Sequence, residues 1–261
     1  MRPILRLCLA TVLLLVLSDA APAPHTVLAA TPISRFDLPW WRTRHEAKLA
    51  ELRTHPADLI FLGDSITQDY EVSGPPEWRD FVPVWQHFYG DRNAVNLGFS
   101  GDATSHLLWR IENGEVVGIA PKVAVILIGA NNLGRLHWSA EDTVTGIDAI
   151  IAELRRRLPH TKLLLLGVLP SERSAWATET TLTINKVLAE RYHNHDEVTY
   201  LDIGRVFMKA GKLDRDLFLD PKLTPPEAPL HPSAEGQALM AEAIEPRLAK
   251  LLGDTRHVAA R

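Results

Sequence analysis

Five short apolar runs along the chain predict buried β-strands. Each run is nearly continuous rather than alternating, and continuous apolar strands are typical of a parallel sheet that helices cover on both faces. Four of the five end at a glycine and the last at Asp202, so we expect turns where the strands stop. The runs occupy residues 57–62, 94–97, 123–128, 163–166 and 198–201.

Longer segments with helical patterns alternate with these runs. The predicted helices cover about residues 103–112, 140–158, 179–194 and 233–252. Ser139 is placed to cap the second of them and Pro159 follows its end, whereas Pro246 should kink or divide the last. The alternation predicts an α/β fold, a doubly wound (flavodoxin-like) five-stranded parallel sheet in a three-layer α/β/α sandwich. Such sheets bind ligands at the carboxyl ends of their strands.

The first residues have the pattern of a signal peptide over residues 1–20, in which two arginines precede an apolar stretch and small residues surround Ala20. We expect cleavage after Ala20 or, alternatively, after Ala30. The stretch is shorter than the ~20 residues that a membrane-spanning helix needs, so the predicted location is the periplasm or the cell exterior. Residues 21–39, rich in alanine and proline, are interpreted as a tether, and residues 40–254 as a single domain.

Composition excludes several classes of protein. The 261 residues include 28 Lys and Arg against 32 Asp and Glu, and a net charge of −4 offers no basic stripe for nucleic acid. The single cysteine, Cys8, lies in the predicted signal peptide, which excludes disulfide frameworks, zinc ribbons and thiol redox pairs. The sequence contains no phosphate-binding loop or dinucleotide fingerprint. We therefore expect neither a metal nor a cofactor.

Three predicted strands end in a glycine followed by small polar residues, and in a parallel sheet the three turns open on one rim. A serine nucleophile needs a sharp turn, a nearby base and donors aimed at the developing oxyanion. Ser65 fits the nucleophile, and its own N–H, the Gly98 N–H and the Asn131 amide fit the donors. Any one turn alone is more typical of an ordinary strand-to-helix connection. The turns read Gly63-Asp64-Ser65, Gly98-Phe99-Ser100-Gly101-Asp102 and Gly129-Ala130-Asn131-Asn132.

The general base should be a histidine from the same rim. Of the 11 histidines, His231 stands out, because it lies just before the last predicted helix and after a loop dense in proline. The others are interpreted as surface or core residues.

In this order, these blocks resemble those of the SGNH (GDSL-type) hydrolases, and the resemblance extends from about residue 57 to 252. It implies the SGNH hydrolase fold, Ser65 as nucleophile, His231 as base, and an oxyanion hole made by the Ser65 N–H, the Gly98 N–H and the Asn131 side chain. Further stretches are similar to the catalytic subunits of platelet-activating-factor acetylhydrolases and their bacterial relatives. These are Asn96 to Thr104, Leu108-Trp109-Arg110, Glu112-Asn113-Gly114-Glu115 and Pro121-Lys122-Val123.

One position departs from the family pattern. The family has an aspartate three residues before its histidine, where this chain has Ala228. Loss of the acid that orients the histidine can lower the turnover of a serine triad by about 10⁴. Glu227 is the preferred candidate for that acid and Asp220 the runner-up. A backbone carbonyl that holds His231 in a Ser–His dyad is the third alternative.

The sequence thus predicts an exported serine esterase that removes short acyl groups, above all acetyl, from oxygen esters through an acyl-enzyme. The expected substrate is a small acyl ester or an O-acetylated saccharide of the envelope or the extracellular space. The resemblance also suggests a homodimer. Two alternatives are an O-acyltransferase that uses the same serine and histidine, and a non-catalytic module that binds acyl groups or glycans, which Ala228 motivates.

Overall fold

The computed structural model describes residues 26–55 and 57–254, and at its centre lies a five-stranded parallel sheet. The strand order is β2-β1-β3-β4-β5, so the chain winds outwards in both directions and confirms the doubly wound fold. Each strand falls on a predicted one. The bounds are β1 Leu59–Gly63, β2 Ala94–Gly98, β3 Val123–Leu127, β4 Lys162–Leu166 and β5 Val198–Leu201.

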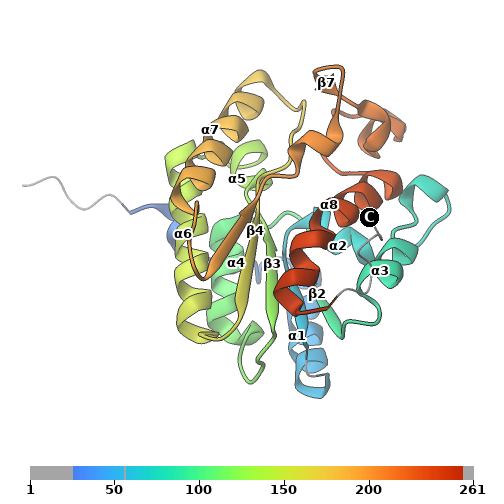
Figure 1. Cartoon of the computed structure of the whole chain (residues 1–261). Helices are drawn as coiled ribbons and strands as arrows, with labels where there is room; N and C mark the ends of the chain where they lie inside the picture. Colours follow the sequence, from blue (N-terminus) through green and yellow to red (C-terminus); the bar gives the residue numbers. More distant parts are fainter. Residues whose placement is uncertain (1–25, 56, 255–261) are drawn as a thin grey trace, which may run out of the picture.

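Helices cover both faces of this sheet and complete three layers (Figure 1). One face is covered by α4, α6 and α7, and the other by α3 and α8. A short hairpin of β6 (Met208–Lys209) and β7 (Lys212–Leu213) follows β5. The helices are α1 Pro39–Thr54, α2 Ser65–Gln68, α3 Val82–Tyr89, α4 Thr104–Arg110, α5 Ala130–Gly134, α6 Ala140–Arg157, α7 Ala175–Arg191 and α8 Ala234–Leu252.

The strands are apolar throughout because both of their faces are buried. In β1, Ile60 and Leu62 belong to the core under α4, α6 and α7, while Leu59 and Phe61 belong to the core under α3 and α8. Burial of a side chain of this size contributes about 1.5–3 kcal/mol, so a polar residue is unfavourable on either face. The register pairs Gly63 with Gly98 and with Leu127, so neighbouring strands end level and their polar turns meet at one edge.

The described part of the segment before α1 is folded onto the domain, which corrects the interpretation of these residues, 26–38, as part of a tether over residues 21–39. A 3₁₀ turn at Leu28–Ala30 packs against α4 and α6, and Ala29 is buried. The Ala29 carbonyl accepts a hydrogen bond from the Thr104 hydroxyl at 2.7 Å. Small alanine side chains, which suggested a tether, here allow the backbone to approach the helices closely. Residues 1–25, with the predicted signal peptide, lie outside the described residues.

Helix α8 runs unbroken through Pro246, so of the two expected effects of this proline, a kink or a division, the division is wrong. Proline removes one backbone hydrogen bond from a helix and crowds the preceding turn. Ile244 and Leu248, on either side of Pro246, are fully buried against the sheet. Both halves of α8 therefore pack on the same face of the sheet.

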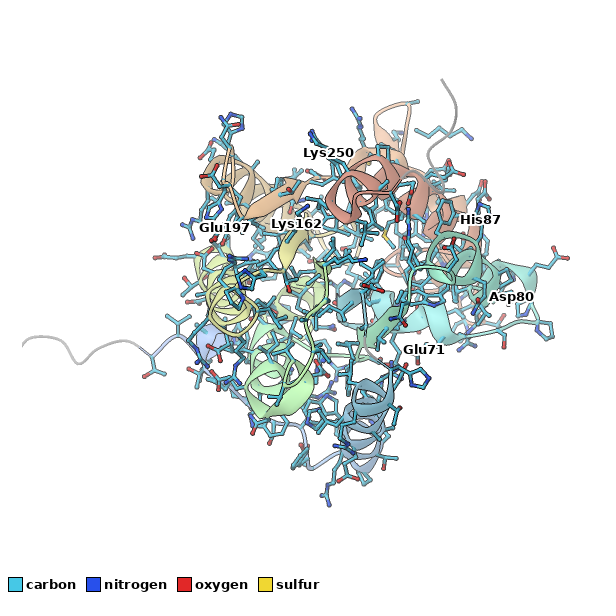
Figure 2. The ribbon with its side chains drawn as sticks, turned by 60° about the horizontal axis from the view of Figure 1, so that its bottom comes forward. Glu71, Asp80, His87, Lys162, Glu197 and Lys250 are labelled. Carbon is cyan, nitrogen blue, oxygen red and sulfur yellow. The ribbon has the colours of Figure 1, made fainter. Side chains whose placement is uncertain are left out.

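The amino-terminal edge of the sheet carries charged side chains. Lys162 and Glu197, at the starts of β4 and β5, lie side by side there (Figure 2). The Leu163 N–H donates to the Glu197 carbonyl at 3.3 Å, and the Lys162 ammonium donates to the Leu251 carbonyl at 2.9 Å. At this edge a backbone hydrogen bond joins β4 to the start of β5 and the Lys162 ammonium joins β4 to the end of α8, while the predicted site lies at the opposite edge.

Candidate active site

Ser65 lies in the turn between β1 and α2. Helix α2 begins there because Asp64 caps it, and the Asp64 carboxylate accepts a hydrogen bond from the Ile66 N–H at 3.0 Å. As the first helical residue, Ser65 has a backbone N–H without an intrahelical acceptor. The cap thus presents a half-buried hydroxyl and an unpaired N–H at the carboxyl end of the sheet.

His231 meets Ser65 across the fold. Its Nε2 lies 3.0 Å from the Ser65 Oγ, and its Nδ1 lies 2.7 Å from the Asp220 Oδ1. An ionised carboxylate only accepts hydrogen bonds, so the Nδ1 carries the proton and the Nε2 is left to accept from the serine hydroxyl. The three residues have the geometry of a Ser-His-Asp triad.

Asp220 takes the place that the sequence assigned to Glu227. The segments on either side of the loop pair, since Leu219 donates to the His231 carbonyl at 2.9 Å and Phe218 forms a bridge with Pro232. This pairing sets Asp220 directly beside His231, whereas Glu227 lies exposed at the outer part of the loop. Glu227 contributes only its backbone N–H, which donates to the Asp220 carbonyl at 2.9 Å. The preference for Glu227 is therefore wrong.

Asp220 is held in one orientation. Its Oδ2 accepts hydrogen bonds from the backbone N–H groups of Leu230 at 2.8 Å and His231 at 2.6 Å, which leaves the Oδ1 for the imidazole. The carboxyl is buried, and burial works against its charge. The bonds from His231 and from the two N–H groups nevertheless lower the pKa of Asp220 below its usual value.

The charges around His231 favour its protonated form. Burial alone would lower the pKa of the imidazole, but the hydrogen bond and charge of Asp220, with two further carboxylates, raise it above its usual 6.5. Those carboxylates are Asp69 and Asp64. Burial raises the pKa of Asp64 to about 7 and that of Asp69 to about 6. The imidazole is thus a stronger base than a free histidine.

Gly98 does not present its N–H to this site. The N–H donates to the Asn96 Oδ1 at 2.8 Å. A Cβ at Gly98 would lie 2.2 Å from the Gln68 backbone nitrogen, so this glycine allows β2 and α2 to pack closely. The sequence singled out a glycine at the end of β2, but the reason for this glycine is packing.

The Asn131 side chain lies between the turns that contain Ser65 and Gly101. The Asn131 Nδ2 donates to the Asp102 carbonyl at 3.0 Å and lies 3.4 Å from the Asp64 Oδ2. The amide nitrogen therefore contacts the neighbours of both Ser65 and Gly101. Gly101 has a left-handed φ of +76°, and its N–H has no acceptor among the described residues. Gly101 was not among the predicted donors, although it is the second glycine of the same turn, and this was the available signal.

A buried ion network fixes the turn that contains Gly101. The Asp102 carboxylate accepts hydrogen bonds from Trp41, Arg35 and Arg110 at 2.8, 3.0 and 2.8 Å. The fully buried Arg110 also bonds to Glu115 and donates to the Gly63 carbonyl at 3.2 Å. Because Arg110 reaches both the Gly63 and the Asp102 turns, the positions of the two turns are coupled.

The described residues contain no group of three or more His, Cys, Asp or Glu side chains that could hold a metal ion. Within the same residues, none of the helices combines the length and apolar character needed to span a membrane.

The chain matches the model of the GDSL-like lipase/acylhydrolase family over residues 61–239, which include Ser65, Asn131, Asp220 and His231. The chain belongs to this family. The resemblance drawn from the sequence blocks is thereby confirmed, and this GDSL-like acylhydrolase is a serine hydrolase that acts on esters.

Relatives of the acylhydrolase include the alpha2 subunit of platelet-activating factor acetylhydrolase IB from Rattus norvegicus. It is 31% identical over 197 residues, which cover 74% of this chain and 77% of the relative. A GDSL-like lipase from Bacteroides thetaiotaomicron has a TM-score of 0.58 at 18% identity and covers 80% of this chain and 97% of its own. A carbohydrate acetylesterase family member from Sinorhizobium meliloti has a TM-score of 0.57 at 16% identity and covers 76% and 99%. These two structures share the fold.

Proposed function

We propose that this acylhydrolase is an exported esterase that removes acetyl or other short acyl groups from oxygen esters of a saccharide through an acyl-enzyme on Ser65. The observation that carries the proposal is the line of contacts from the Ser65 Oγ to His231 at 3.0 Å and from His231 to Asp220 at 2.7 Å. This line supplies a nucleophile, a base and the acid that orients the base.

In the first half-reaction, the Ser65 Oγ attacks the ester carbonyl carbon while the His231 Nε2 takes the hydroxyl proton. The carbonyl oxygen becomes an oxyanion. We assign its stabilisation to the N–H groups of Ser65 and Gly101 and to the Asn131 Nδ2, in place of the Gly98 N–H that the sequence suggested. The tetrahedral intermediate collapses as His231 returns the proton to the leaving alkoxide, and an acyl-serine and a free alcohol result.

In the second half-reaction, water replaces the alcohol. His231 takes a proton from the water as its oxygen attacks the acyl carbon, and the same donors bind the second oxyanion. Collapse breaks the bond to the Ser65 Oγ, which regains a proton from His231, and the carboxylic acid leaves. Asp220 keeps its charge throughout and stabilises the imidazolium.

The finer parts of the proposal have separate supports. A short acyl group is consistent with the names of the acetylhydrolase relatives, and a saccharide with that of the Sinorhizobium meliloti neighbour. Export is supported by the signal-peptide pattern of residues 1–20. The non-catalytic alternative loses its motivation, because Asp220 is an acid beside His231 despite Ala228.

The proposal is tested with the purified chain and p-nitrophenyl esters of acetate, butyrate and octanoate. We expect kcat/KM to fall as the acyl chain lengthens, and Ser65→Ala to abolish turnover with an unchanged circular dichroism spectrum. Ser73→Ala, an exposed serine, is the matched control and should behave as wild type. Wild-type turnover by the Ser65 variant would refute the nucleophile, and a preference for octanoate would refute the short acyl group.

Export is tested by fractionation of cells that express the full chain or a chain without residues 1–20. Esterase activity outside the cytoplasm with the full chain only is the expected result, and the same distribution for both would refute export.

A further inference from the structure

Two guanidinium groups converge on one point beside the oxyanion donors. A Cβ built on Gly101 would lie 2.8 Å from the Arg135 Nη1 and 3.1 Å from both the Nη1 and the Nη2 of Arg35. Arg135 follows α5, one turn after Asn131, and Arg35 precedes α1. Two segments far apart in the sequence therefore deliver positive charge to the same side of Gly101.

The Arg35 guanidinium already has partners. Its Nη1 donates to the Ser100 carbonyl at 2.8 Å and to Asp102 at 3.0 Å, and Asp102 also accepts a hydrogen bond from Arg110. Arg135 is exposed, and its guanidinium has no acceptor among the described residues. Arg135 therefore brings to this side of Gly101 a positive charge that no described carboxylate bonds.

His106 lies within range of these charges. Burial and then the charges of Arg35, Arg110 and Arg135 lower the pKa of His106 to about 4, against the opposing charge of Asp37. Its Nδ1 accepts a hydrogen bond from the Ala103 N–H at 2.9 Å, as a neutral imidazole does. The histidine is therefore neutral and does not compete with the two arginines for an anion.

Like charges that lie this close together repel one another, and more strongly at a protein surface than in bulk water. An anion between the two guanidinium groups would replace this repulsion with two attractions. Guanidinium groups also match the geometry of carboxylate and phosphate, which they bind through paired N–H donors.

Arg173, in the segment between β4 and α7, also contacts α5 but has another role. Its Nη2 donates to the Ala130 carbonyl at 2.7 Å, and the charges that it senses are those of Asp64 and Asp220. It offsets the carboxylates of the active site, so it is not counted with Arg35 and Arg135.

We propose that Arg35 and Arg135 form an anion subsite that selects esters whose alcohol carries a carboxylate or phosphate. The inference rests on the proposed function, because a short acyl group such as acetyl has no charge of its own and the anion must then belong to the alcohol. The subsite adjoins Gly101, so the charged group lies within a few bonds of the ester that is cleaved.

The test compares matched pairs of acetate esters. One pair is an O-acetylated methyl glucuronoside and the corresponding methyl glucoside, and the other is acetylglycerol phosphate and acetylglycerol. We expect wild-type kcat/KM to favour the anionic member of at least one pair by about tenfold, since charge-assisted hydrogen bonds are stronger than neutral ones and partial exposure weakens them. The preference should fall as salt rises from 50 to 500 mM. A preference in the first pair alone identifies an acidic sugar, and in the second alone a phosphorylated alcohol.

Arg135→Gln should reduce the ratio of anionic to neutral kcat/KM to near one, and Arg35→Lys, which keeps the charge and avoids a change in folding, should retain most of it. Arg42→Gln is the control, because the guanidinium of this exposed arginine donates to the Phe36 carbonyl and lies over the Phe36 ring, and the ratio should stay at the wild-type value. Equal rates within both pairs, or an unchanged ratio in Arg135→Gln, would overturn the subsite. The esterase proposal would stand in that case if Ser65→Ala still abolished hydrolysis of the neutral esters.

Discussion

Replacement of Asp220 by asparagine tests the triad most sharply, because the surroundings of Asp220 determine how the new amide must lie. Two backbone N–H groups, from Leu230 and His231, point at the Oδ2 at 2.8 and 2.6 Å. Only an oxygen satisfies them, so the asparagine oxygen takes that position and its NH₂ faces the His231 Nδ1. The Nδ1 must then accept, which transfers the imidazole proton to the Nε2.

A histidine with its proton on the Nε2 cannot take the proton of Ser65. We therefore expect Asp220→Asn to lower kcat by about 10⁴, the magnitude known for a serine triad with an inverted tautomer, which corresponds to about 5.5 kcal/mol of activation free energy. Glu227→Gln is the control and should leave kcat unchanged, since the Glu227 side chain is exposed.

Initial rates with p-nitrophenyl acetate measure the effect, and thermal melting checks that the variant folds. Turnover of Asp220→Asn within tenfold of wild type would refute the reasoning. A larger loss in Glu227→Gln than in Asp220→Asn would return the role to Glu227.

Three further predictions follow from the site and its packing. Because only the neutral imidazole of His231 accepts a proton and its pKa is raised, kcat/KM should begin to fall with decreasing pH at a value above 6.5. Asp69→Asn removes a nearby negative charge and should move this acid limb to lower pH; an unmoved limb in a pH–rate profile would contradict the assignment. Asn131→Ala should lower kcat by about 10²–10³, as loss of one oxyanion donor does, and a loss below tenfold with p-nitrophenyl acetate would exclude that role. Gly98→Ala should destabilise the fold by about 1–3 kcal/mol because its Cβ would meet the Gln68 backbone at 2.2 Å, and calorimetry should show a lower Tm, whereas an unchanged Tm would disprove the packing argument.

The fold could be predicted because the strands are buried on both faces and hence apolar without interruption. Helix α1 escaped prediction for the opposite reason. Its buried positions are Trp41, His45, Lys48 and Leu52, so half of its inner face is polar and no apolar stripe marks it. The Lys48 ammonium bonds to Glu51 and Glu71 at 2.8 Å, which makes its burial tolerable. The burial of Lys48 thus depends in part on Glu71, outside the helix, and a pattern of apolar positions within the helix cannot reveal it.

The site could be predicted where a residue's role follows from its turn, and not where it depends on distant pairing. Ser65 and Asn131 follow strands directly, so their place on the rim could be inferred from the sequence. Asp220 reaches His231 only because the segments around Leu219 and His231 run antiparallel, and no local pattern records this. Gly98 and Gly101 look alike in sequence, and only the backbone separates the glycine that packs from the glycine with an unpaired N–H.

The first described residues of the chain pack against helices that come much later in the sequence. Ala29 bonds to Thr104, 75 residues further on, and a Cβ at Gly146 of α6 would lie 2.4 Å from the Ala29 carbonyl oxygen. The 3₁₀ turn at Leu28–Ala30 therefore lacks its packing surface until α6 has been synthesised. Cleavage of a leader after Ala20 would leave the contacts of Leu28–Ala30 with α4 and α6 intact, whereas cleavage after Ala30 would remove them.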